Sequence, residues 1–487
     1  MKKIICALLA LLMVLVPVAL ASCSNQADET GDDTTAANAN TGDDTAAADT
    51  SADNTVEETL DIPTGLDYDG AEFVILTNYD LDYNYGTMDF DEPQDDTVDQ
   101  AYYLRNLAVE ELLNITITEV QDDLGSDIYT LMKTDADSNT ADYDIIFNNM
   151  GSTCTAVGAG YALNVDETFY IDLDKSWWNA DATEQLALMG GHYMVAGGIA
   201  TNDKDCIWVM YFMKDILNSN SKITTTPYDE VYAGTWTWDV MFAMADECDQ
   251  DVNANGERDS GDIYGLCTHS ENYAASWESA GLKLITLDSS GYPQVSWGTD
   301  EFVEVYEDIA ALMGNTEVVS PDNVAFITTA IERCQTLFGT EVIAFAEEYR
   351  NCDYEFGIVP YPKYSSEVDR YYSYIAYNAS VMMIEYVHPD AEWVGIVSEA
   401  LAYYGQQILT PAYYEIQLQG RYSRDEESQG MLDIIFEYRC YDLGVFFDWG
   451  GAKTSLSTSG ANASTLYASL NKAITKAIEK SLTKLGS

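Results

Sequence analysis

Positively charged residues are scarce in this chain. Its 487 residues include 22 Lys and Arg but 82 Asp and Glu, which gives a formal net charge of −60 at pH 7. A surface this negative repels the phosphates of nucleic acids and of anionic membranes, so we expect neither as a partner. It also disfavours strongly anionic ligands, and it leaves neutral or cationic ligands.

Signatures of catalysis are missing as well. The three histidines, His192, His269 and His388, fit no metal-ligand spacing, and the chain has no G-x-S-x-G, P-loop or G-x-G-x-x-G motif. These absences predict a protein that is not an enzyme. The acid pair that glycoside hydrolysis needs is left open as an alternative, because 82 carboxylates are present.

The N-terminus has the features of an export signal. Lys2 and Lys3 precede an uncharged apolar run from Ile4 to Ala21, and the run ends in small residues directly before Cys23. This pattern predicts a signal peptide at residues 1–22 and a lipid on Cys23 after cleavage. The alternative is an uncleaved anchor, since 18 apolar residues could just span a bilayer, but Pro17 and the small residues favour cleavage.

Residues 23–62 have the composition of a tether. From Ser24 to Leu60 the chain carries ten carboxylates and no Lys or Arg. Such a stretch buries too little apolar surface to offset chain entropy, so we expect an extended, disordered spacer. Cleavage would remove two lysines and no acid, which makes the net charge of the mature chain −62.

The remaining cysteines do not form a recognisable disulfide framework. Seven are left after Cys6 and Cys23, at wide and irregular spacing and without a C-x-x-C motif. We expect buried free thiols. Pairing of Cys334 with Cys352, or of Cys248 with Cys267, is the alternative.

Strands and helices alternate along the rest of the chain. In its first half the pattern predicts strands at 73–76, 115–120, 143–147, 192–198 and 206–211, and helices at 95–113 and 127–133. In its second half it predicts a helix at 238–248, strands at 342–346, 356–359 and 371–384, and helices over 390–408 and most of the C-terminal part. In the first half, alternation of this kind implies a largely parallel sheet, with ligands at the carboxyl ends of its strands.

Several motifs carry a resemblance to a known family. They are the cysteine motif at Cys23, the turn Tyr68-Asp69-Gly70 before the first strand, the aromatic run from Tyr170 to Asn179, Gly234-Thr-Trp-Thr-Trp238 at a helix start, and Arg424-Asp-Glu-Glu-Ser428. With these motifs the chain resembles the extracellular solute-binding lipoproteins of ABC importers. The likeness is to the carbohydrate-type, family 1-like group of Gram-positive gut anaerobes.

The resemblance implies a periplasmic-binding-protein-like α/β fold of type II, with two α/β lobes joined by a multi-crossing hinge. It places residues 63–205 with 363–412 in lobe 1 and residues 206–362 with 413–487 in lobe 2, with crossings near Asp205 to Met210 and Pro360 to Pro362. The lobes are expected to close on a ligand without chemistry. It also implies an ABC permease and its ATPase as partners, and a monomer held on the extracellular face of the cell membrane through its lipid anchor only.

Residues 251–262 match an EF-hand-type calcium loop. Oxygen-bearing side chains occupy positions 1, 3, 5, 9 and 12, Gly256 occupies position 6, and position 7 contributes its carbonyl. Asp at position 12 reaches less far than the usual Glu. The pattern predicts a structural Ca²⁺, against the alternative of a polar loop, with the ligands Asp251, Asn253, Asn255, Glu257 and Asp262.

Aromatic residues are abundant, with 35 Tyr, 14 Phe and 9 Trp. A sugar ring has an apolar C–H face and a rim of hydroxyls, so its receptor combines flat aromatic rings with polar side chains. For each aromatic residue, core packing is the alternative to ligand contact. The candidate ligand-binding residues are Asn78, Tyr79, Asn148, Asn149, Trp177, Trp178, Asn202, Asp203, Trp208, Trp277, Glu347, Glu348 and Trp449.

Together these features predict a substrate-binding lipoprotein that captures a neutral sugar or oligosaccharide in the inter-lobe cleft and delivers it to the permease. The alternatives are a secreted glycan-degrading enzyme and a surface adhesin that holds glycans without a transport role. Peptides and polyamines are left open as ligands.

Overall fold

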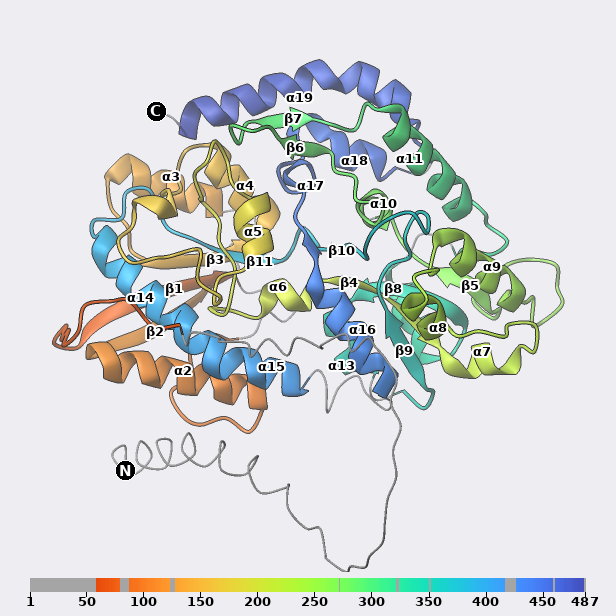
Figure 1. The fold of residues 1–487 in the computed structure, drawn as a ribbon, viewed down its shortest axis with the longest axis horizontal. Coiled ribbons are helices and arrows are strands. Elements are labelled where there is room, and N and C mark those ends of the chain that lie inside the picture. The colour runs from red at the N-terminus through yellow and green to blue at the C-terminus, as the bar shows by residue number, and fades with distance from the viewer. Residues whose placement is uncertain are drawn as a thin grey trace, which may run out of the picture. The chain divides into compact units, whose positions relative to one another are not determined.

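The computed structural model describes residues 58–78, 87–122, 128–270, 272–320, 324–349, 352–416, 426–458 and 460–485. The predicted signal peptide, Cys23, Tyr79 and most of the predicted tether lie outside these residues. The described strands and helices form two four-stranded mixed sheets with helices packed on them, as Figure 1 shows.

The first sheet has the strand order β11-β3-β1-β2. Its strands β1, β2 and β3 are parallel, with α2 and α3 between them in the sequence, and β11 is antiparallel to β3. Phe73, Ile75 and Ile145 are fully buried, as expected of strands covered on both faces. The predicted β-α-β pattern is confirmed by β1 (Ala71–Asn78), α2 (Thr97–Leu113), β2 (Ile115–Asp122), α3 (Ile128–Ser138), β3 (Ile145–Asn149) and β11 (Ser380–Met383).

Helix α2 shows how local sequence sets these bounds. Asp96 caps its start, because the Asp96 carboxylate accepts hydrogen bonds from the N–H groups of Val98 and Asp99. The helix ends at Asn114, whose backbone adopts the left-handed conformation at φ 51°.

The second sheet has the strand order β5-β8-β4-β9. Its β4 is antiparallel to β8 and β9, and β5 is parallel to β8. All six residues of β4 are buried, so this strand forms the centre of the larger hydrophobic cluster. The bounds are β4 (Trp208–Met213), β5 (Tyr264–Cys267), β8 (Thr336–Val342) and β9 (Phe356–Val359).

Further helices and two short two-stranded sheets complete the described part. The helices are α4 (Met150–Gly158), α5 (Ala180–Gln185), α6 (Asn202–Asp205), α7 (Lys214–Ser219), α8 (Pro227–Tyr232), α9 (Trp238–Cys248), α10 (Asn272–Glu278), α11 (Asp300–Met313), α12 (Val324–Glu332), α13 (Ala346–Tyr349), α14 (Ala391–Tyr404), α15 (Thr410–Ile416), α16 (Glu426–Glu437), α17 (Leu443–Phe447), α18 (Ala452–Leu456) and α19 (Ala463–Leu485). The short strands are β6 (Ile285–Leu287) with β7 (Pro293–Val295), and β10 (Ser373–Tyr374) with β12 (Arg439–Cys440).

Two expected strands are wrong, and the strand expected at 371–384 is divided by a turn into β10 and β11. Residues 192–198 make only isolated bridges, because a Cβ at Gly197 or Gly198 would lie within 3 Å of neighbouring backbone atoms and the segment packs too closely for a regular ladder. Residues 343–345 form a 3-10 turn after β8 has ended at Val342. A short apolar run does not distinguish a buried strand from a buried turn.

Three connecting segments lie side by side between the two sheets. Ile207, just before β4, pairs with Ile375, and the Ala376 N–H donates to the Cys206 carbonyl at 2.9 Å. β10 pairs in parallel with β12, so the segment around Arg439 lies next to the segment around Tyr374. The chain returns to the first sheet through residues 373–379. The bounds expected for the two lobes remain predictions.

The C-terminal helix α19 contacts elements next to both sheets. Near its start, Tyr467 meets Trp297 edge-on, with 5.2 Å between ring centroids. Near its end it approaches α4, where a Cβ on Gly158 would lie 3.0 Å from Ser481 Oγ. Figure 1 shows α19 passing α4 at one end and α11 at the other.

The described part contains no helix long and apolar enough to cross a membrane. All seven of its cysteines are free, and five of them are buried. Burial raises the pKa of the Cys154 and Cys206 thiols well above the usual range, which makes them poor nucleophiles.

Candidate functional site

Amide side chains gather at one edge of the first sheet. Asn78 ends β1, and Asn148 and Asn149 end β3, whose carboxyl ends lie at the same edge because the two strands are parallel. Asn149 also caps α4, with its Oδ1 accepting a hydrogen bond from the Ser152 N–H at 2.9 Å. The strand-end prediction therefore brings three of its candidates together.

Tyr377 joins this edge from the connecting segment. The Gly151 N–H, at the start of α4, donates to the Tyr377 carbonyl at 3.2 Å. The Tyr377 side chain is 43% exposed, and Lys453 of α18 places its Nζ 4.9 Å from the centre of the ring. Sequence reasoning missed Tyr377. Its place depends on the pairing of β11 with β3, which no local pattern reveals.

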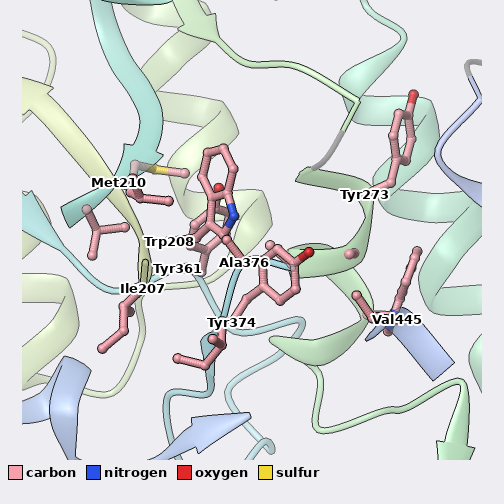
Figure 2. Packing of buried hydrophobic residues seen from close by; sticks show 14 of the residues in the cluster. Ile207, Trp208, Met210, Tyr273, Tyr361, Tyr374, Ala376 and Val445 are labelled. Carbon is pink, nitrogen blue, oxygen red and sulfur yellow. The ribbon is translucent and has the colours of Figure 1, made fainter. Parts of the chain in front are cut away.

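An aromatic group marks the facing edge of the second sheet. Trp208 begins β4, and its ring lies parallel to Tyr374, 6.4 Å between centroids and 11° between planes. His269, just after β5, lies 4.9 Å from Trp208. Figure 2 shows Trp208 and Tyr374 together with Ala376 and Tyr361. Trp208 is 6% exposed, and no described residue accepts a hydrogen bond from its Nε1.

Strand ends of both sheets thus converge on residues 374–378. We call this region the junction. Among its rings Tyr377 is 43% exposed, whereas Trp208 and Tyr374 are 6% and 1% exposed and pack on each other. Tyr377 can pack on a ligand, and the half-buried Asn149 amide can exchange hydrogen bonds with it. The junction comprises Asn78, Asn148, Asn149, Trp208, His269, Tyr374, Tyr377 and Lys453.

Trp177 and Trp178 lie elsewhere, in the core of the first lobe. They are 2% and 3% exposed, and their Nε1–H groups donate to the two oxygens of the Glu399 carboxylate at 3.0 and 2.9 Å. Burial raises the pKa of Glu399 to about 7, although the two indole hydrogen bonds act in the opposite direction. This placement leaves neither indole face open to a ligand.

Asn202 and Asp203 are buried in α6, where Asp203 is part of an ion-pair network. Its Oδ2 accepts a hydrogen bond from Arg439 Nη1 of β12 at 2.6 Å, and Lys204 Nζ lies 3.4 Å from its other oxygen. Asp203 therefore links α6 to the connecting strand, a role that accounts for its charge without a ligand.

The remaining candidates are dispersed. Trp277 is fully buried against Phe302, and Trp449 stacks on Phe447 at 4.2 Å between centroids. Glu348 is exposed in α13. Glu347 belongs to the same helix, and its side chain lies outside what the structure describes.

The predicted calcium loop connects α9 to β5. Gly256 at position 6 has φ +77°, and its N–H donates to Asp251 Oδ2 at 2.9 Å. The carboxylate of Asp262 is fully buried and accepts hydrogen bonds from the N–H groups of Val252 and Asp259. Asp251 Oδ1 is buried without a hydrogen-bond partner among the described residues. The tight turn is present, and one candidate ligand oxygen has no donor.

The other side chains of the predicted calcium loop are not oriented as metal ligands in this structure. Asn253 and Asn255 turn their amide nitrogens toward Asp259, at 3.4 and 3.0 Å, and Glu257 is exposed. The Arg258 guanidinium lies 3.9 Å from the carboxylate at position 12. No three His, Cys, Asp or Glu side chains in the described ranges are placed to hold a metal, so a cation here would depend on amide and backbone oxygens as well.

Comparison with known proteins identifies the fold. No protein-family model matches the chain, and no curated protein matches it in sequence. Among solved structures, M. tuberculosis UspC has a TM-score of 0.55 at 13% identity, covering 83% of this chain and 100% of UspC. A cyclo/maltodextrin-binding protein complexed with maltotetraose has a TM-score of 0.55 at 11% identity, covering 84% of this chain and 98% of its own. The chain has the type II periplasmic-binding-protein-like fold with two α/β lobes, as the family resemblance implies.

Proposed function

We propose that this chain is a substrate-binding protein that captures a neutral sugar or oligosaccharide between its lobes. The observation that carries the proposal is the junction, where the exposed ring of Tyr377 and the buried Trp208–Tyr374 pair lie next to strand-end amides of the first sheet. Aromatic rings pack on the C–H face of a sugar, and amides exchange hydrogen bonds with its hydroxyls. The fold adds support, because one structure that shares it holds maltotetraose.

Capture in this proposal needs closure and no chemistry. Asn78 and Asn149 belong to the first sheet, whereas Trp208 begins a strand of the second sheet and His269 follows another. A ligand that touches both groups binds the closed arrangement more tightly than the open one, and this difference in affinity shifts the equilibrium toward closure. The net charge of −60 favours ligands without negative charge.

A thermal-shift screen across sugars, amino acids and polyamines, followed by calorimetric titration, tests this function. We expect saturable binding of short neutral oligosaccharides. Tyr377→Ala should weaken it about tenfold, the value of one aromatic contact. Tyr386→Ala is the matched control, because Tyr386 is 60% exposed and lies after β11 rather than before it. Binding of amino acids or polyamines, and of no sugar, would refute the sugar assignment.

The two alternatives predict different behaviour. A glycan-degrading enzyme would release new reducing ends during incubation with oligosaccharides, and turnover of that kind would replace the transport proposal. A surface adhesin would be retained on particulate glycans and would not bind short soluble sugars.

We propose further that Cys23 carries a lipid and that the protein works on the extracellular face of the membrane with an ABC permease and its ATPase. The support is the apolar run and small residues before Cys23. Mass spectrometry of the mature N-terminus should find a diacylglyceryl cysteine. An unprocessed N-terminus would contradict the proposal.

We also propose a structural Ca²⁺ in residues 251–262. Its ligands would be oxygens of Asp251, Asn253, Asn255 and Asp262 and the backbone carbonyl of Glu257. The unpartnered Asp251 Oδ1 and the turn at Gly256 support this, since Ca²⁺ takes six to eight oxygen ligands in flexible geometry. Bound Ca²⁺ would cross-link the two ends of the loop, next to α9 and β5.

A further inference from the structure

Two buried carboxyl groups in the first lobe face each other. Asp135 of α3 is 7% exposed, and Glu385, just after β11, is 1% exposed. Their carboxyl groups lie within hydrogen-bonding range of each other. As carboxylates both can only accept, and Asp135 Oδ2 and both Glu385 oxygens have no hydrogen-bond partner among the described residues.

The charged groups on the surrounding segments do not compensate this pair. Asp142 adds a third negative charge, which raises the pKa of both carboxyl groups. Lys133 of α3 pairs instead with Asp137, and His388 Nε2 lies 3.1 Å from Asp144 Oδ1. Two adjacent buried carboxylates without a cation repel each other strongly, so the pair cannot hold two charges at neutral pH.

We propose that Asp135 and Glu385 share one proton at neutral pH, with Glu385 as donor and Asp135 as acceptor. The proton converts two mutual acceptors into a hydrogen bond that joins α3 to the end of β11. It also gives a partner to two of the three carboxylate oxygens that otherwise have none.

The pKa shifts of the two carboxyl groups agree with Glu385 as the donor and Asp135 as the acceptor. Burial first, and the neighbouring Asp135 second, raise the pKa of Glu385 from its ordinary 4.5 to about 8. Burial also raises the pKa of Asp135, while its hydrogen bond with Glu385 lowers it. Tyr161, whose carbonyl accepts the Tyr386 N–H, also has a raised pKa and stays neutral throughout this range.

A bound cation fits the pair less well than a proton. Ca²⁺ requires six to eight oxygens and Mg²⁺ six in octahedral geometry, whereas two carboxyl groups supply at most four oxygens. Across the described residues, no group of three His, Cys, Asp or Glu side chains is placed to hold a metal ion.

The shared proton makes the first lobe sensitive to pH. Between pH 4.5 and 8 the folded state binds one proton more than the unfolded chain at Glu385, so this contribution to stability is complete below pH 4.5 and is lost as pH rises through 8. Loss of the proton removes the hydrogen bond that holds the end of β11 to α3. β11 comes directly after residues 374–378 of the junction, so the effect of pH acts on the strand next to the junction.

Thermal and urea unfolding of the full chain from pH 5 to 9 tests the proposal, with Glu385→Gln as the main variant. Gln keeps the shape and cannot lose a proton. The folded-to-unfolded ratio of the variant relative to wild type should rise by up to about tenfold per pH unit up to pH 8 and then level off. Asp137→Asn, on the same helix but with its side chain 69% exposed, is the matched control and should show no such rise.

Asp135→Asn gives an independent readout. Removal of the neighbouring charge should lower the pKa of Glu385, so stability should level off at a lower pH than in wild type. Parallel profiles for Glu385→Gln and wild type would overturn the shared proton. So would a stabilisation of wild type, and not of Glu385→Gln, by Ca²⁺, Mg²⁺ or Na⁺ at pH 8, which would assign the pair to a cation. If Glu385→Gln does not fold, an Asp135→Asn profile identical to wild type overturns the proposal.

Discussion

Replacement of Trp177 by alanine is expected to destabilise the first lobe. The indole ring is 2% exposed, meets Tyr403 edge-on at 5.2 Å between centroids, and donates its Nε1–H to Glu399 at 3.0 Å. Its removal leaves a cavity beside a carboxyl group that is itself 1% exposed. Trp178 then remains as the single indole donor to Glu399, at 2.9 Å.

The size of the effect follows from these contacts. Truncation of a buried Trp costs about 3–5 kcal/mol, and loss of a hydrogen bond to a charged group adds about 1.5–3 kcal/mol. Unfolding of about 430 residues has an entropy of about 0.9 kcal/mol per kelvin, so a total of about 4.5–8 kcal/mol lowers the Tm by about 5–9 °C. Trp177→Phe keeps most of the ring volume and loses the N–H, so its Tm should fall by about 2 °C.

Circular dichroism during heating, together with calorimetric titration of the oligosaccharide that the proposed screen identifies, gives both readouts. Phe169→Ala is the control, because Phe169 is 60% exposed and surface substitutions usually stay within about 0.5 kcal/mol. A Trp177→Ala protein that melts like wild type and yet loses the ligand would refute this reasoning. It would instead support the sequence-based expectation that Trp177 touches the sugar.

Three further predictions concern the calcium loop and two buried acids. EDTA should lower the Tm of wild type and leave that of Asp262→Asn unchanged; equal Tm values with and without EDTA in the metal-loaded wild type would count against the site. Burial raises the pKa of Glu399 from 4.5 to about 7, so wild type should lose stability relative to Glu399→Gln as pH rises from 4.5 to 7, and a constant difference would contradict this. Arg439→Ala should cost about 3 kcal/mol, since it leaves Asp203 buried with one charged partner fewer, and urea unfolding that matches wild type would disprove the role of this ion pair.

Elements with a strong local signal could be predicted from the sequence. The helix at 238–248 and the strand at 356–359 coincide with α9 and β9, because a Thr237 cap and a compact apolar run mark their ends. The strand expected at 342–346 is wrong because the true strand, β8, contains Thr336, Thr340 and Glu341. These polar residues are buried, and only their tertiary surroundings make them so.

The candidate site, the junction, could be predicted only where a local sequence signal marks its residues. Strand-end amides such as Asn78 and Asn148 lie together because parallel strands end at one edge. The position of Trp177 depends on Glu399, 222 residues further along the chain, and that of Tyr377 on an antiparallel strand pair. Neither partner follows from periodicity or composition, so sequence reasoning places Trp177 among the candidates and omits Tyr377.

The C-terminal helix α19 has a mechanical consequence for the proposed capture of a ligand. With 23 residues, α19 is a helix about 35 Å long. Tyr467 packs against Trp297 near one end, and Ser481 packs against Gly158 near the other. In the proposed function, separation of the two lobes would require α19 to detach from Trp297 or from α4, or to bend. The helix would therefore limit how far the lobes separate when the ligand leaves.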